Sequence, residues 1–273
     1  MRFALIDDKR AEAGPGLKGS CPGCEQPVIA KCGRQRSHHW AHRNDKKCDF
    51  WREPETEWHR SWKNNFPSEW QEVILPDQQT GEKHIADICT DYGLVIEFQH
   101  SHMHPQERTS RENFYSDMVW VVDGTRLKND YKRLLKGKDN GRALKPGVFL
   151  IEFPDECFPL MWLGSPVPII FDFQDSDSIA DVQDMRNYLY CLFPIKVGPS
   201  AVLTVWSRND FINMTINGDW LLWVSRSMHE LIQYNKDIQN LNEIRRQQQQ
   251  NIALVQFMKR TAPYRTTNRR RRF

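Results

Sequence analysis

The sequence predicts an α/β protein with a central sheet, which follows a small cysteine-rich segment and precedes a long C-terminal helix. Between residues 55 and 122, helical and extended patterns alternate in the order helix, strand, strand, strand, helix, strand. The last of these, "VWVV" at 119–122, is a short continuous apolar run typical of a buried strand. At 273 residues, 39% apolar and 11% aromatic, the chain can form one large domain or two ordinary ones.

The first helix is predicted from its aromatic spacing. Trp58, Trp62 and Phe66 recur every four residues and follow Pro54, a residue favoured at helix starts. The other elements expected in the first half are a strand at 1–7, a polar loop at 9–20, a strand at 72–75, a hairpin within 85–101 and a helix at 105–118.

The second half continues with a charged connector at 129–147 and further strands. These are expected within 148–153, 160–173 and 201–207, around a helix at 178–193. The pattern leaves open whether they extend the first sheet or form a second domain. Residues 221–258 are expected to form one long helix, in which Leu231, Tyr234, Ile238 and Leu241 have the 3-4 spacing of a coiled-coil seam. Packing onto its own domain is favoured over dimerisation.

Charge is distributed unevenly along the chain. The net charge is +3, yet residues 245–273 contain nine Lys/Arg and no acid, so the rest has 29 basic against 35 acidic residues. An arginine run of this kind, Arg269, Arg270, Arg271 and Arg272, attracts polyanions such as nucleic acid. No apolar run approaches the roughly 20 residues of a membrane span, and the acidic N-terminal stretch is unlike a signal peptide, so a cytoplasmic location is expected.

The cysteine spacing predicts a metal site. The seven cysteines are an odd number, and Cys21, Cys24, Cys32 and Cys48 crowd into one segment, which favours metal binding over disulfides. "CPGC" followed by "HHWAHRNDKKC" at ribbon-like distance predicts structural zinc held by Cys21, Cys24, His42 and Cys48. His39 competes with His42, and Cys32 is a weaker candidate. A redox role for "CPGC" and a set of free thiols are the alternatives.

The hairpin "IADICTDYGLVIEFQHS" carries acids at positions suited to a second metal. Glu97 and Gln99 share one face of a strand, and Asp87 can lie near Glu97 if the turn falls at "TDYG". Converging carboxylates suit Mg²⁺ or Mn²⁺, which can activate water for attack on a phosphodiester. On the preceding helix, Glu55 could complete the metal site while His59 and Lys63 contact phosphate, although solvated Glu/Lys pairs are common on helices.

Several of these motifs together resemble the CoiA-like competence proteins. The motifs "CPGC", "HHWAHRNDKKCDF", "ETEWHRSWK", "IADICTDYGLVIEFQHS", "ERTSRENFY" and "VWVV" occur in that family's order between about Cys21 and Asp123. The resemblance implies a zinc-binding segment joined to a nuclease domain like that of the PD-(D/E)XK endonucleases. It makes Asp87 and Glu97 the metal-binding acids and puts Gln99 where many such enzymes have lysine.

The resemblance also assigns residues on two helices. Glu55, His59 and Lys63 match the family's conserved helix, and Arg108, Arg111 and Tyr115 lie on the helix that borders the site and are expected to contact nucleic acid. His100, His102 and His104 have no assigned role.

The sequence therefore predicts a Mg²⁺-dependent deoxyribonuclease acting in competence, DNA processing or defence against foreign DNA. A non-catalytic nucleic-acid-binding protein, and an assembly protein oligomerising through the long helix, are the alternatives. The expected divisions are a zinc-ribbon-like segment at 1–52, a PD-(D/E)XK-like core at 53–128, an α+β extension at 129–220, the long helix at 221–260 and a basic tail at 261–273.

Overall fold

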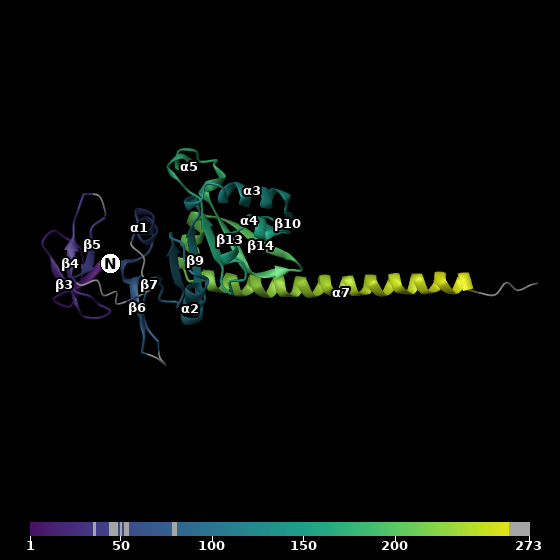
Figure 1. Cartoon of the computed structure of the whole chain (residues 1–273), viewed down its shortest axis with the longest axis horizontal. Coiled ribbons are helices and arrows are strands. Elements are labelled where there is room, and N and C mark those ends of the chain that lie inside the picture. Colours follow the sequence, from purple (N-terminus) through teal and green to yellow (C-terminus); the bar gives the residue numbers. More distant parts are fainter. Residues whose placement is uncertain (35–36, 44–48, 50, 52–54, 78–80, 262–273) are drawn as a thin grey trace, which may run out of the picture. The chain divides into compact units, whose positions relative to one another are not determined.

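The computed structural model describes the chain except for residues 35–36, 44–48, 50, 52–54, 78–80 and 262–273. The predicted ligand Cys48 and the arginines at 269–272 lie outside the described residues. The chain divides into two units, residues 1–227 and 228–273, which are described separately. The first unit contains two sheets, a small N-terminal one and a main one, shown in purple and in blue to green (Figure 1).

The N-terminal sheet has the strand order β2-β1-β3-β4-β5. Asp7 and Asp8 have φ values of 49° and 60°, the left-handed geometry of a two-residue hairpin turn, and this turn pairs Ile6 with Lys9. The loop predicted at 9–20 is therefore wrong in part, because it contains two strands. The strands of this sheet are β1 (Phe3–Ile6), β2 (Lys9–Glu12), β3 (Lys18–Ser20), β4 (Pro27–Lys31) and β5 (His39–His42).

A small apolar core supports the N-terminal sheet. Trp40, 2% exposed, packs with Met1, Ala4, Cys21 and Val28, and its Nε1 donates to the carbonyl of Ala11. The segment thus buries apolar surface of its own, although it has few aliphatic residues.

The main sheet has nine strands in the order β10-β11-β14-β13-β12-β9-β8-β7-β6. The open question about the second half of the chain is resolved, because its strands extend the first sheet through β12, which pairs in parallel with β9. The strands are β6 (Gln71–Pro76), β7 (Lys83–Cys89), β8 (Val95–Gln99), β9 (Met118–Asp123), β10 (Arg142–Lys145), β11 (Val148–Ile151), β12 (Ile169–Asp172), β13 (Tyr188–Val197) and β14 (Ser200–Ser207).

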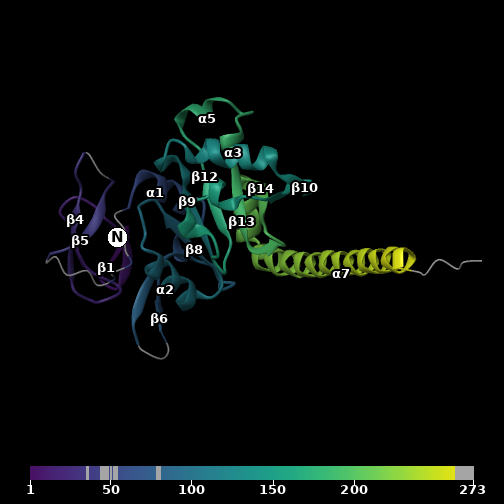
Figure 2. The same ribbon diagram turned by 45° about the vertical axis from the view of Figure 1, so that its right-hand side comes forward.

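Helices cover both faces of the main sheet (Figure 2). On one face, Leu134 of α3 packs in the cluster that contains Trp120. On the other face, Trp62 of α1 stacks on Phe98 of β8 with ring centroids 5.7 Å apart and meets Phe211 of α6 at 6.2 Å. The helices of four or more residues are α1 (Glu57–Lys63), α2 (Pro105–Tyr115), α3 (Asp130–Asn140), α4 (Pro154–Cys157), α5 (Ser176–Ala180), α6 (Arg208–Ile216) and α7 (Asp219–Thr261).

Two predicted helices need correction. The first begins at Glu57, two residues after Glu55, where Thr56 caps it and exchanges hydrogen bonds with His59 in a capping box. The helix predicted at 178–193 is confined to α5, and residues 188–193 belong to β13, where pairing with both β12 and β14 outweighs local preference.

The predicted long C-terminal helix is confirmed as α7, which has 43 residues. Within the second unit Leu231 is 7% exposed, whereas most of the larger apolar side chains after it are about half exposed, including Leu241 at 55%, Ile252 at 58% and Val255 at 46%. Among the described residues, no helix is both long and apolar enough to cross a membrane.

Candidate functional site

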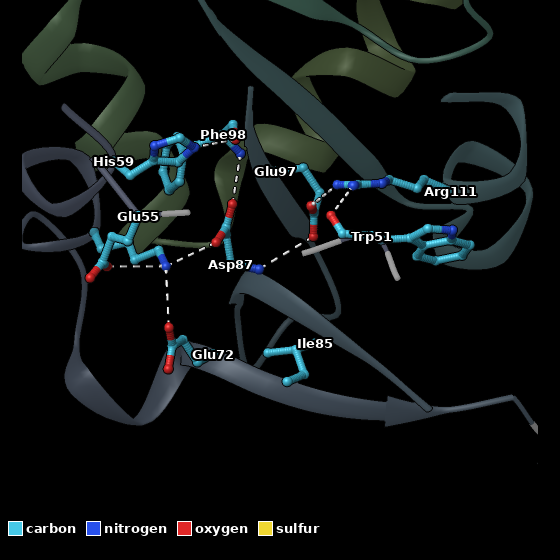
Figure 3. Close-up of a pocket in the computed structure, with 10 residues that line it drawn as sticks. Trp51, Glu55, His59, Glu72, Ile85, Asp87, Glu97, Phe98 and Arg111 are labelled. Atoms are coloured by element: carbon cyan, nitrogen blue, oxygen red, sulfur yellow. Dashed lines mark hydrogen bonds and ion pairs between the residues drawn. The ribbon is translucent and has the colours of Figure 1, made fainter. Parts of the chain in front are cut away.

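The acidic residues of the hairpin lie where β7 and β8 separate. Going back from the turn at 90–94, the backbone pairing ends at Ile88 opposite Ile96. Beyond this pair, side chains replace the backbone ladder: Asp87 N–H donates to Oε1 of Glu97 at 3.3 Å, and Phe98 N–H donates to Oδ2 of Asp87 at 3.1 Å (Figure 3). The predicted proximity of Asp87 and Glu97 is therefore present, and the gap between the strands forms a pocket.

Lys63 lies among three carboxylates at this pocket. Its Nζ is 2.9 Å from Asp87 Oδ1, 3.4 Å from Glu55 Oε1 and 3.6 Å from Glu72 Oε1. Burial alone would lower the pKa of Lys63, but these acids raise it above its usual value. Lys63 in turn lowers the pKa of Asp87, against the opposing effect of burial. The ammonium group is therefore a fixed positive charge in the site.

Glu72 is a site residue that the sequence prediction missed. It lies on β6 with φ at 47°, an unfavourable backbone conformation for a residue with a side chain. Its carboxylate accepts hydrogen bonds from the backbone N–H groups of Arg2 (2.9 Å) and Phe3 (3.1 Å) and also contacts Lys63. Glu72 thereby links the N-terminal sheet to the pocket.

Glu97 is held by an arginine on its other side. Its Oε2 accepts from Nη1 of Arg111 at 3.0 Å, and Arg111 also binds Glu107 at 2.5 Å. Burial, together with the nearby charge of Asp87, raises the pKa of Glu97 to about 8 despite Arg111. Without further positive charge the site therefore disfavours ionisation of Glu97, and a bound cation would favour it.

His59 is oriented by contacts on both ring nitrogens. Its Nε2 is 2.8 Å from the carbonyl oxygen of Phe98, to which it donates, and its Nδ1 is 2.8 Å from Oγ1 of Thr56. Glu55 lies just before α1, where Oε2 accepts from Arg60 at 2.5 Å. The structure thus brings Glu55, His59 and Lys63 together at the pocket, with His59 fixing the position of β8 against α1.

The pocket has a volume of about 30 Å³, enough for a water molecule or a small ion. Its walls carry four carboxylates and two permanently cationic side chains, so full ionisation leaves an excess of two negative charges. The lining residues are Trp51, Glu55, His59, Lys63, Glu72, Ile85, Asp87, Glu97, Phe98 and Arg111 (Figure 3). Charge and donor type both suit a divalent cation.

The remaining predicted residues of this region lie beside the pocket. Gln99 follows Glu97 on the same face of β8, and its Nε2 donates to the carbonyl of Ser101 at 3.0 Å. Arg108 contacts the carbonyl of Met161, and Tyr115 is 8% exposed. Arg111 is 4% exposed and points to Glu97, so the structure directs these α2 side chains inward.

A second missed feature anchors the chain just before the pocket. Asp49 accepts from the backbone N–H of Ile85 at 2.8 Å and lies 3.1 Å from Nδ1 of His84. Trp51 stacks on the His84 ring at a centroid distance of 3.3 Å, and its carbonyl accepts from Arg111. The end of the cysteine-rich segment is therefore fixed to β7.

Three of the four predicted zinc ligands converge in the N-terminal sheet. The sulfurs of Cys21 and Cys24 and a ring nitrogen of His42 all lie within 4.8 Å of one another, and Cys24 Sγ is 3.2 Å from His42 Nε2. The Cys24–His42 separation is close to that of ligand atoms in tetrahedral zinc, which lie roughly 3.3–3.8 Å apart for bonds of about 2.0–2.3 Å. His39 points elsewhere, with Nδ1 2.9 Å from the carbonyl of Ser37. Of the two histidines considered as the third zinc ligand, the structure therefore favours His42.

Comparison with known families agrees with this segment. Residues 18–51 match the model described as competence protein CoiA, N-terminal domain. The predicted resemblance to CoiA-like proteins is thus confirmed for the segment that contains the metal-ligand cluster and is fixed to β7. Of the residues that line the pocket, the match includes only Trp51. No curated protein and no solved structure matches the chain significantly.

Proposed function

We propose that the chain is a metal-dependent deoxyribonuclease with a PD-(D/E)XK-like core. The observation that supports this most is the separation of β7 and β8 at Asp87 and Glu97. It leaves the partly buried Asp87 and the buried Glu97 facing a small pocket with excess negative charge. The order of elements also accords with the fold that the family resemblance implies. The acids lie on the antiparallel strands β7 and β8, and the helix α2 and the strand β9, parallel to β8, follow.

The residues present fit a Mg²⁺ or Mn²⁺ ion. Asp87 and Glu97 would hold it, and Glu55 and Glu72 lie close enough to Lys63 to adjust the local charge. Oxygen donors are the ligands that these hard cations prefer. When bound, the ion would polarise the phosphodiester and lower the pKa of a water molecule.

The chain's own residues supply orientation and positive charge. Arg111 fixes the Glu97 carboxylate, and the Phe98 backbone fixes that of Asp87, so neither acid has to reorient for binding. Gln99 stands where many PD-(D/E)XK enzymes have lysine and carries no charge. Lys63, whose Nζ is 2.9 Å from Asp87, would supply the positive charge instead. Its ammonium group is suited to stabilise a phosphate oxygen, while Gln99 would orient the attacking water through its amide.

Hydrolysis requires water to form a bond to phosphorus while the bond to one ester oxygen breaks, and that oxygen leaves with a proton. The ammonium group of Lys63 is buried among carboxylates that raise its pKa. It would therefore stabilise negative charge rather than release a proton. Proton transfer would therefore fall to solvent or to a carboxylate of the site.

The N-terminal segment is proposed to carry structural zinc on Cys21, Cys24 and His42, with Cys48 as the fourth ligand. This segment reaches the pocket through Glu72 and Trp51, so folding of the zinc site would support the nuclease site. The biological setting is proposed to be the processing of foreign DNA, in competence or in defence.

The test is cleavage of linear, circular and single-stranded DNA by the purified protein with Mg²⁺, Mn²⁺ or neither, alongside Asp87→Asn. We expect metal-dependent cleavage that Asp87→Asn abolishes while DNA binding persists. Binding without cleavage by the wild type under every condition would favour the non-catalytic alternative, in which Lys63 and Arg111 serve only to neutralise buried acids.

A further inference from the structure

The stretch that follows β9 in the chain, which includes α3 and β10, is strongly basic. Residues 126–145 contain eight Lys/Arg and two Asp, a net charge of +6. Apart from this segment and residues 245–273, the chain has 21 basic and 33 acidic residues. This net basic stretch, in a unit whose other residues include more acidic than basic side chains, is here called the α3 basic surface.

Seven of the eight cations of this surface are exposed, and the exception is Lys138, whose ammonium lies over the Phe149 ring. On α3, Leu134 is 1% exposed and faces the core, whereas Lys132, Arg133 and Lys136 fall on the opposite side and are exposed. Lys128, in the turn before the helix, is also exposed. The ammonium groups of Lys128, Lys132 and Lys136 form no hydrogen bond or ion pair with any residue that the structure describes, so their charge is available to a ligand.

A chain of contacts connects this surface to the pocket. The ring of His59, which lines the pocket, lies 6.3 Å from that of His100 at the end of β8. Nδ1 of His100 is 2.7 Å from Oδ2 of Asp123, whose Oδ1 accepts from the N–H of Thr125 at 2.9 Å. Asp123, 6% exposed, thus joins His100 to the start of the α3 basic surface.

We propose that the α3 basic surface binds the sugar–phosphate backbone of DNA and leads it to the pocket past His100. This inference rests on the proposed nuclease function and adds the path of the substrate. The α2 side chains expected to contact DNA are directed inward, so the outward cations of residues 126–145 take that role. Backbone contacts of this kind carry little sequence preference.

The test compares two triple variants with equal loss of charge. Lys128→Ala/Lys132→Ala/Lys136→Ala removes cations of the surface, and Lys31→Ala/Lys83→Ala/Lys236→Ala removes exposed lysines elsewhere. Binding to a fluorescent 30-base-pair duplex is measured at several salt concentrations without added divalent ions, so that no cleavage occurs. We expect the first variant to bind at least about tenfold more weakly at 0.1 M salt, with a log–log salt slope reduced by roughly 2 to 3.

Equal affinities for the two triple variants, or no duplex binding by the wild type, would overturn the inference. Cleavage with Mg²⁺ separates the two proposals. Wild-type cleavage with no selective loss of affinity in the first variant would reject the surface and leave the nuclease standing. Selective loss of affinity without any wild-type cleavage would support the surface and reject the nuclease. Circular dichroism of both variants checks that each is folded.

Discussion

Replacing Lys63 with methionine should destabilise the first unit and make its stability depend on a divalent ion. Lys63 is 3% exposed, and its ammonium group faces Asp87, Glu55 and Glu72 at 2.9–3.6 Å. Methionine keeps much of the length and removes the charge, which leaves buried carboxylates without their shared counter-ion.

The size of the effect follows from breaking a buried ion pair, which costs about 3–5 kcal/mol. For a unit of 227 residues, each kcal/mol corresponds to about 2–4 °C in Tm, so the Tm should fall by roughly 6–20 °C. Mg²⁺ at 100 times its Kd would restore about 2.7 kcal/mol. In Lys63→Met no ammonium group competes with Mg²⁺ for the carboxylates. Mg²⁺ should therefore stabilise Lys63→Met more than it stabilises the wild type.

The assay is thermal unfolding of both proteins over a range of MgCl₂ concentrations, with NaCl at matched ionic strength. Lys83→Met, which changes an exposed lysine on β7, is the control and should unfold close to the wild type. The reasoning would be refuted if Lys63→Met unfolded like Lys83→Met, or if Mg²⁺ raised neither Tm.

Two other predictions concern the zinc cluster and Glu97. Cys24→Ser should lower the zinc content of the purified protein, measured by mass spectrometry, and increase proteolysis of the N-terminal sheet, because metal binding is coupled to folding; an unchanged zinc content would contradict the cluster. Because the pKa of Glu97 is raised in the folded state from 4.5 to about 8, the folded protein binds more protons than the unfolded chain between these values, and this group's contribution to stability falls as pH rises through that range. Without divalent ions, Glu97→Gln should therefore gain stability relative to the wild type from pH 5 to pH 8.5 in denaturant titrations, and a constant difference would be inconsistent with the raised pKa.

The sequence predicted those features whose signals are local. The CxxC motif with its later histidine, the acids on either side of a Gly-containing turn and the long helix all depend on short spacings. Tyr188 to Phe193 were mispredicted because a strand buried between two neighbours shows a continuous apolar run that also suits a helix. The strand at 9–12 depends on a left-handed Asp7–Asp8 turn, which polar residues adopt but do not require.

Glu72 could not be found from spacing. It reaches Lys63 because β6 pairs with β7 in one register and because its own backbone adopts an unusual conformation, and both depend on the folded sheet. The inward direction of Arg111 is likewise a tertiary property, set by Glu97 and the carbonyl of Trp51. Sequence reasoning thus named three of the four acids of the pocket, whereas Glu72 and the pairing of the acids with Lys63 and Arg111 required the structure.

The most direct test of the central proposal compares DNA cleavage by wild type, Glu97→Gln and Asp91→Asn with Mg²⁺. Asp91 is an exposed acid in the turn of the same hairpin, so its variant controls for loss of an acid at a neighbouring position. The proposal predicts cleavage by wild type and Asp91→Asn and a loss of at least about a hundredfold in Glu97→Gln, typical of removing one strong electrostatic contact to the reacting groups. Equal cleavage by all three proteins would show that the acids between β7 and β8 are not the active site.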